Sequence, residues 1–356
     1  MTKLPGQVVL VLQGGGALGA YQAGVYEAMH EAGIEPEWVI GTSIGAINGA
    51  IIAGNPPAER LPRLREFWQR VEIKSPFANW EAVVRGIPAM YEPRALAWAG
   101  VGAGVGIDRA SYYVTQPLRA TLEPLIDFRL VNAKDTPRLT IGAVHVTKGQ
   151  MRYFDSRDEP GGLGLDHVMA SGALPPGFPA IRIDGEAYWD AGVYSNTPIE
   201  AVFDDNPRRD SLVFGVNVWQ PTGPEPQSIW QVMGRQKDVQ YASRDDIQVD
   251  RQKQIHHMRR IIRELARHLP PEKQRDCRDL AASGCHTTMH VVRLLAPTLD
   301  SEDFFKDIDF SGAGIRRRWE AGLDDARRMI ARAPWQAPVD PLAGVVVHEL
   351  SARAGK

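Results

Sequence analysis

Residues 39–48, VIGTSIGAIN, decide how this chain is expected to fold. The stretch passes from a β-branched run into Gly41-Thr42-Ser43-Ile44-Gly45 and then into small residues that favour a helix. This G-x-S-x-G spacing is typical of a nucleophile elbow, a sharp strand-to-helix turn that exposes a serine at a helix N-terminus. It predicts Ser43 as a nucleophile, with Gly41 and Gly45 supporting the turn. The structural alternative is a serine that only caps the following helix.

The segments on either side of this turn repeat the strand-to-helix pattern. Residues 8–12 are a continuous apolar run of the kind that forms a buried parallel strand. Residues 18–32 then place apolar side chains on one helical face until Gly33 stops the helix. Residues 44–53 predict a second helix, which ends at GNPP. This alternation predicts an α/β fold, a parallel-type central sheet flanked by helices.

The middle of the chain predicts two hairpins and another buried strand. Asp184-Gly185 between two short runs is a strong two-residue hairpin turn, and TKGQ at residues 147–150 is a second turn. Residues 212–219 read as a buried strand, and residues 61–71 form an amphipathic helical stripe. The glycine-rich segment AWAGVGAGVGID, residues 97–108, is interpreted as a packed loop, with a mobile cover over an apolar pocket as the alternative.

A change of composition at residues 221–226, PTGPEP, marks the expected domain boundary. We expect one α/β domain over residues 6–220, a helical and basic C-terminal extension over 227–333, and a loosely attached tail over 334–356. Residues 255–269 combine an apolar face with several arginines. We interpret them as a helix docked on the core with a solvated basic face, in preference to a helix on a membrane surface.

Composition excludes several classes of protein. The chain has 356 residues, of which 44% are hydrophobic and 24% charged, as in ordinary globular proteins. Its net charge of −2 gives no general attraction to nucleic acid, so no nucleic-acid partner is expected. Cys277 and Cys285 fit neither a disulfide framework nor a zinc site, and no cluster of acids or histidines has metal-ligand spacing, so neither metal nor cofactor is expected. The first apolar run is too short for a signal peptide, and no run of about 18 apolar residues exists. We therefore expect a cytoplasmic protein whose contact with membranes is at most peripheral.

The glycine loop QGGGALG, residues 13–19, follows the first predicted strand. Its G-x-G-x-x-G spacing, which includes Gly19, also fits a dinucleotide fingerprint, but that site needs an acid at the end of the second strand. The nearest acids, Glu35 and Glu37, precede the second predicted strand, residues 38–40. We favour an oxyanion hole, because glycine lets backbone N–H groups approach a substrate closely. Its candidate donors are Gly14, Gly15 and Gly16.

The segment EAYWDAGVYSNTP, residues 186–198, places a carboxylate in a tight turn after a hairpin strand. The structural alternative for Asp190 is a turn aspartate bonded to its own backbone, with Gly192 completing the turn. Residues 169–181, MASGALPPGFPAI, predict a rigid loop that fixes this hairpin. A general base needs such rigidity to stay within hydrogen-bonding distance of a nucleophile, so Asp190 is a candidate base.

Taken together, three stretches resemble the patatin-like phospholipases: GGGALGAYQAGV, GTSIGAING and GALPPGFPAIRIDGEAYWDAGVYSNTP. The resemblance covers about residues 6–218. It implies a fold related to the α/β hydrolases and a lipid acyl hydrolase that uses a serine–aspartate dyad without histidine. It assigns Ser43 as nucleophile, Asp190 as base and the amides of Gly14, Gly15 and Gly16 as oxyanion hole, with a lipid or other acyl ester as substrate. The region after residue 226 looks like the extension of a bacterial subgroup.

One residue departs from the family pattern, and two other functions stay open. Leu18 stands where many family members have Arg or Lys, so a cation near the oxyanion is missing while the backbone donors remain. A Ser-His-Asp esterase would need a histidine, and His145, His167 or one in the C-terminal region could serve. A vestigial or regulatory nucleotide-binding protein would use the glycine loop instead. For the dyad, a carboxylate with a pKa near 4 is a weak base, so we expect Asp190 to be desolvated by apolar neighbours.

Overall fold

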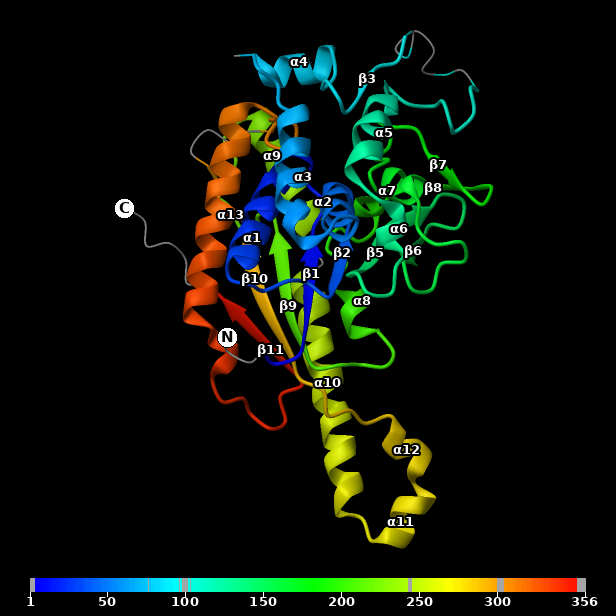
Figure 1. Cartoon of the computed structure of the whole chain (residues 1–356), viewed down its shortest axis with the longest axis vertical. Helices are drawn as coiled ribbons and strands as arrows, with labels where there is room; N and C mark the ends of the chain where they lie inside the picture. Colours follow the sequence, from blue (N-terminus) through cyan, green and yellow to red (C-terminus); the bar gives the residue numbers. More distant parts are fainter. Residues whose placement is uncertain are drawn as a thin grey trace.

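A mostly parallel nine-stranded sheet runs through the molecule (Figure 1). The computed structural model describes residues 4–75, 77–95, 97, 102, 104–242, 245–299 and 304–350. The strand order is β11-β10-β9-β1-β2-β5-β8-β7, with β6 paired to β5. The strands are β1 (Gln7–Leu12), β2 (Trp38–Gly41), β5 (Arg138–His145), β6 (Gln150–Asp155), β7 (Ile181–Ile183), β8 (Glu186–Asp190), β9 (Ser211–Asn217), β10 (Met289–Leu295) and β11 (Val345–Glu349). The α/β class predicted from the sequence is confirmed.

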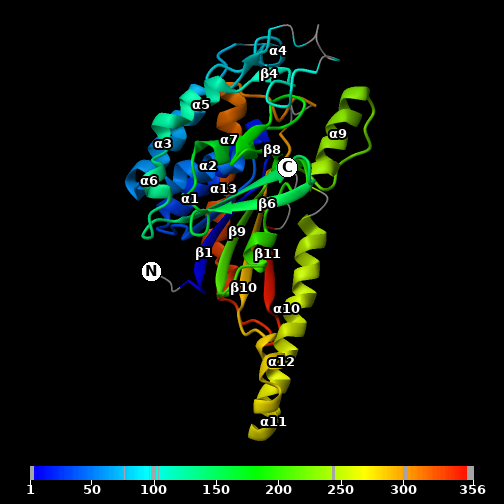
Figure 2. The same cartoon turned by 90° about the vertical axis from the view of Figure 1, so that its right-hand side faces the viewer.

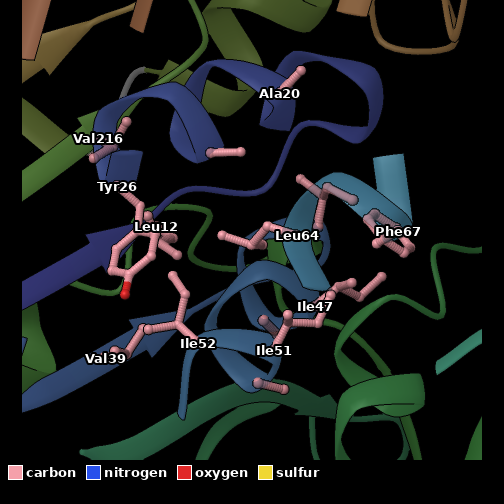
Figure 3. Packing of buried hydrophobic residues seen from close by; sticks show 14 of the residues in the cluster. Leu12, Ala20, Tyr26, Val39, Ile47, Ile51, Ile52, Leu64, Phe67 and Val216 are labelled. Carbon is pink, nitrogen blue, oxygen red and sulfur yellow. The ribbon is translucent and has the colours of Figure 1, made fainter. Parts of the chain in front are cut away.

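Helices cover both faces of this sheet, because alternate side chains of its central strands point to opposite sides. Leu10 and Leu12 of β1 pack under α1 (Ala20–Glu31), α2 (Ile44–Ala53), α3 (Pro57–Arg70) and α13 (Gly312–Arg332). Figure 3 shows Leu12 together with Tyr26, Ile47, Leu64 and Phe67 in this layer. On the other face, Val9 and Val11 pack with side chains of α8 (Glu200–Phe203) and α10 (Asp245–His268).

Smaller elements surround this frame. A two-stranded sheet pairs β3 (Glu92–Pro93) with β4 (Tyr113–Val114). The remaining helices are α4 (Ala78–Val84), α5 (Gln116–Leu122), α6 (Phe128–Val131), α7 (Leu165–Ser171), α9 (Ile229–Ala242), α11 (Pro271–Asp276) and α12 (Arg278–Ala282), with 3-10 helices η1 (Gly16–Gly19), η2 (Glu123–Leu125), η3 (Ala191–Val193) and η4 (Pro334–Gln336). Among the described residues, no helix is long and apolar enough to cross a membrane.

The register of the central strands gathers three loops at one edge of the sheet. Leu12 is aligned with Gly41 of β2 on one side and with Val216 of β9 on the other, and all three strands are parallel. The glycine loop, the Ser43 turn and residues 218–219 therefore leave the sheet next to one another. In open α/β sheets, ligands bind at the carboxyl ends of strands in this way.

The region after residue 226 is part of the sheet, which corrects two expectations. Strand β10 pairs with β9, and β11, inside the segment expected to be a loose tail, pairs with β10. Helix α13 packs so closely on α1 that Gly24 faces the backbone of Trp319, and Gly322 faces the backbone of Tyr21. The extension is thus only partly helical, and the sheet continues across the boundary expected at residues 221–226.

Helix α10 packs on the core with a different face from the one predicted. The apolar side chains predicted to pack inward include Met258 and Leu265, which are 57% and 63% exposed. His256 is buried instead, and the Arg260 guanidinium donates to the backbone carbonyls of His286 and Thr287 at 2.9 and 3.1 Å. The helix is docked as expected, but part of its basic face is the docked side. The glycine-rich segment 97–108 lies partly outside the described residues.

Candidate active site

Ser43 occupies the turn between β2 and α2 in a strained backbone conformation. Its φ of 55° and ψ of −121° place a non-glycine residue in a sparsely populated region, as at other functional turns. The Ser43 side chain makes no capping hydrogen bond to α2, so it does not serve as the cap that was the structural alternative. Its N–H donates to the Ser171 Oγ of α7 at 2.9 Å, which anchors the turn from a helix distant in sequence.

Glycine is required on both sides of Ser43 because the backbone folds tightly on itself. A Cβ atom on Gly41 would lie 2.4 Å from the carbonyl carbon of Gly45, and one on Gly45 would lie 2.3 Å from the carbonyl oxygen of Leu12. Gly19 likewise leaves room for the Ile44 side chain. The close approach explains why the motif needs small residues at these positions.

Asp190 ends β8 and is almost completely buried, with 2% of its surface exposed. Its Oδ1 accepts the Gly192 N–H at 2.6 Å, so it also has the backbone bond expected of a turn aspartate. Its own N–H donates to the Ala173 carbonyl at 3.0 Å, which ties the hairpin to the proline-rich loop as predicted. Burial raises the pKa of Asp190 to about 6, against the opposing effect of hydrogen bonds from the Ser43 side chain and the Gly192 N–H. The carboxylate is therefore next to Ser43 and more basic than an ordinary aspartate.

The glycine loop supplies two candidate oxyanion donors rather than three. The Gly14 N–H, predicted as a third donor, already donates to the Asn196 carbonyl at 3.2 Å. Among the hydrogen bonds of the described residues, none has the N–H of Gly15 or Gly16 as its donor. Both glycines line the cavity that contains Ser43, and Gly16 has a φ of +54°, which favours glycine.

Gln13, which the sequence analysis overlooked, holds the loops of this edge together. It is fully buried, and its Oε1 accepts the Val218 N–H at 2.6 Å while its Nε2 donates to Thr197 Oγ1 at 2.8 Å and to the Tyr241 carbonyl at 3.2 Å. A glutamine directly after an apolar strand and before the glycine loop was the available signal. Its partners lie far away in the sequence, so they could not be identified from the sequence.

A largely apolar cavity of 320 Å³ opens above Ser43 and Asp190. Both side chains line it together with Gly15, Gly16 and Gly192, and none of the nine histidines, all within the described residues, lines it. The apolar walls include Ile47, Met90, Tyr91, Leu118, Leu174 and Phe178. Such a cavity suits an acyl chain whose ester group lies next to Ser43.

Residues after position 218 complete this cavity. Its lining includes Trp219, Tyr241, Asp307, Ile308 and Phe310. The Asp307 carbonyl accepts the Ala17 N–H at 2.8 Å, directly after the two candidate donors. Lys237 of α9 holds the Asp307 carboxylate at 2.8 and 2.9 Å. The extension therefore contacts the oxyanion loop, a role that the sequence did not indicate.

The candidate histidines of a Ser-His-Asp esterase and the candidate acids of a dinucleotide site lie away from the Ser43 cavity. His145 Nε2 is 3.2 Å from the Glu186 carboxylate, and His167 Nδ1 accepts the Gly164 N–H at 2.9 Å in a helix cap. Glu37 accepts the Val8 N–H at 3.3 Å, near the start of β1 and opposite to the glycine loop. Glu35 pairs with Arg60. Neither acid can reach a ribose at the carboxyl end of β2.

Three further observations concern the candidate site and its surroundings. A larger hollow of 590 Å³ lies at the carboxyl ends of β9, β10 and β11, but Ser43 and Asp190 do not line it. Among the residues that the structure describes, no group of three or more His, Cys, Asp or Glu side chains could hold a metal ion. Leu18, at the position of the missing cation, is buried in the core.

Comparison with known proteins decides the family. The family model described as patatin-like phospholipase matches residues 10–203, more than half of the chain, and one described as patatin phospholipase matches residues 239–342. The chain belongs to the patatin-like phospholipase family. This confirms the family predicted from the sequence, and the second match lies within the region after residue 226.

Curated relatives match this patatin-like chain over short stretches. Lysophospholipase nte1 of Aspergillus terreus is 59% identical over 46 residues, which are 13% of this chain and 3% of that protein. Patatin-like phospholipase domain-containing protein 6 of Homo sapiens is 41% identical over 63 residues, which are 18% of this chain and 5% of that protein. The match therefore spans only a small part of these relatives.

Two solved structures are similar over most of this patatin-like chain. VipD from Legionella pneumophila aligns over 92% of this chain and 67% of its own, with a TM-score of 0.41 and 14% identity. ExoU of Pseudomonas aeruginosa, in its complex with SpcU, aligns over 93% and 52%, with a TM-score of 0.38 and 14% identity.

Proposed function

We propose that this protein is a serine lipid acyl hydrolase that uses Ser43 as nucleophile and Asp190 as general base. One observation carries the proposal: a strained serine at a strand-to-helix turn contacts a buried, more basic carboxylate in an apolar cavity without histidine. Membership of the patatin-like phospholipase family supports the substrate class, a phospholipid or another long-chain acyl ester.

In the proposed reaction, the Ser43 Oγ attacks the ester carbonyl carbon while its proton passes to Asp190. The carbonyl oxygen becomes an oxyanion that accepts hydrogen bonds from Gly15 and Gly16. Collapse of this intermediate breaks the ester bond, and the leaving alcohol takes the proton from Asp190. Water then attacks the acyl-serine, gives one proton to Asp190 and releases the carboxylic acid as Ser43 recovers its proton.

The test combines covalent labelling with substitution. A fluorophosphonate should label Ser43 of the purified protein, and Ser43→Ala should abolish both labelling and hydrolysis of p-nitrophenyl esters of graded chain length. Asp190→Asn should lose nearly all turnover, whereas replacing each histidine by alanine should leave a folded protein active. Labelling at another serine, or one folded but inactive histidine variant, would contradict the assignment.

A further inference from the structure

The short helix α4 carries an exposed apolar surface. Phe77, directly before the helix, is 72% exposed, Trp80 is 65% exposed and Val84 is 47% exposed, while Ala78 and Ala82 face inward. Together with Val83, these three residues are called the α4 patch. Large aromatic side chains gathered on one exposed turn are typical of a surface that meets another apolar body.

The α4 patch is continuous with the proposed acyl cavity. Val83 lines this cavity and is also 41% exposed. The Val83 carbonyl accepts the hydroxyl of Tyr113 at 2.7 Å. The Tyr113 ring packs 4.9 Å from that of Tyr91, and both rings line the cavity. A body that covers the patch therefore meets the mouth of the cavity.

The charges near the α4 patch and its position in the molecule indicate what kind of surface covers it. Lys74 and Arg85, on either side of the helix, are exposed, whereas the acid of the helix, Glu81, is half-buried and accepts a hydrogen bond from Ser75 at 3.0 Å. Helix α4 lies at one end of the long axis, and α11 and α12 lie at the other (Figures 1 and 2). An extended surface can thus approach α4 without meeting the projecting α10–α12 segment.

We propose that the α4 patch docks on a phospholipid surface and presents the cavity mouth to it. Phe77 and Trp80 enter the interfacial layer, where amphipathic and aromatic rings are favoured, and Lys74 and Arg85 meet lipid phosphates. The docking deepens the proposed function and rests on it for the identity of the substrate. A lipid can then move from the surface into the cavity past Val83.

The test separates docking from catalysis. Phe77→Ala/Trp80→Ala is compared with Leu265→Ala/Leu280→Ala, a control that removes two equally exposed apolar side chains at the other end of the molecule. Binding to phosphatidylcholine–phosphatidylglycerol vesicles is measured by co-sedimentation in a Ser43→Ala background, which protects the vesicles from hydrolysis. The α4 variant should bind about tenfold or more weakly, and the control should bind as the parent does.

Activity gives the second readout. With Ser43 present, the α4 variant should hydrolyse vesicle phospholipid about tenfold more slowly but dissolved p-nitrophenyl butyrate at the parent rate. Unchanged vesicle binding, or an equal loss with the dissolved ester, would overturn the docking. Hydrogen exchange of the unaltered chain should also slow over residues 77–85 when vesicles are added, and no slowing would count against it. If Ser43→Ala keeps its esterase activity, the proposed function fails, while the binding comparison still decides the docking.

Discussion

Burial of Asp190 has two opposite consequences for the molecule. Removing the carboxylate from water raises its pKa, because the charged form loses solvation, and this favours its proposed role as base for Ser43. The same loss of solvation lowers the free energy of unfolding when the carboxylate is ionised. The pH dependence of turnover and that of stability should therefore run in opposite directions.

Turnover should fall as the pH drops through about 6. The pKa of Asp190 is about 6 in the folded protein, and only the ionised carboxylate can accept the Ser43 proton. The measurement is kcat/KM on a dissolved ester from about pH 4.5 to about pH 8.5, a range that brackets the pKa of Asp190. A histidine base would give a similar fall of turnover at acid pH, so the pH profile alone does not identify the base. Asp190→Asn should therefore remove nearly all turnover at every pH. An Asp190→Asn protein with parental turnover would exclude the carboxylate as base.

The stability of Asp190→Asn should exceed that of the parent at pH 8. A rise of the pKa from 3.8 to about 6 corresponds to a cost of about 3 kcal/mol when both folded and unfolded states are ionised. As the pH falls through 6 towards 4, the folded parent takes up a proton first and this cost disappears. Urea unfolding at pH 8 and at pH 4.5 should show the advantage of the variant shrinking. Asp158→Asn is the control, since its carboxylate is 79% exposed and no comparable gain is expected. An equal advantage at both pH values would contradict the prediction.

At the scale of the elements, local patterns were predicted well and long-range pairing was not. The strand expected at residues 38–40 and the helix at 44–53 appear as β2 and α2, because the turn between them is fixed by Gly41 and Gly45 within one short stretch. Strands β10 and β11 were missed because their short apolar runs become strands only beside β9, far away in the chain. In the site, Ser43 and Asp190 lay in recognisable motifs, whereas Ser171, Gln13 and Asp307 act through partners that no local pattern reveals.

The inward-facing Arg260 should stabilise the fold rather than serve as a solvated charge. It donates to the carbonyls of His286 and Thr287, which lead into β10. Arg260→Ala should lower the free energy of unfolding by about 2 kcal/mol, because charge-assisted bonds to the backbone are lost. Arg267→Ala, whose exposed guanidinium pairs only with Glu264 of the same helix in the described structure, should change it by less than about 0.5 kcal/mol. Equal losses in the two variants would show that Arg260 has no special role.

At the scale of the whole molecule, the edge of the sheet that carries the candidate site is built from segments far apart in the sequence. The Asp307 carbonyl holds the Ala17 N–H, and Lys237 holds the Asp307 carboxylate. Lys237→Met should therefore loosen the support of Gly15 and Gly16 and lower kcat on a dissolved ester by about tenfold or more, with KM changed less. Lys253→Met, which removes an exposed pair with Asp250, is the matched control and should be neutral. A parental kcat for Lys237→Met in a folded protein would show that the loop keeps its geometry without this ion pair.

The placement of Asp307 beside the glycine loop also sets an order of events when the protein is made. A ribosome delivers the nucleophile turn and the glycine loop first, and strand β10 and the Asp307 carbonyl that support them follow much later in the sequence. Until that segment has folded onto the sheet, the glycine loop lacks this support, and we expect Ser43 and the candidate oxyanion donors to be without their final geometry. If the proposed hydrolase function holds, we therefore expect a growing chain to be inactive towards lipids until this later segment has joined the sheet.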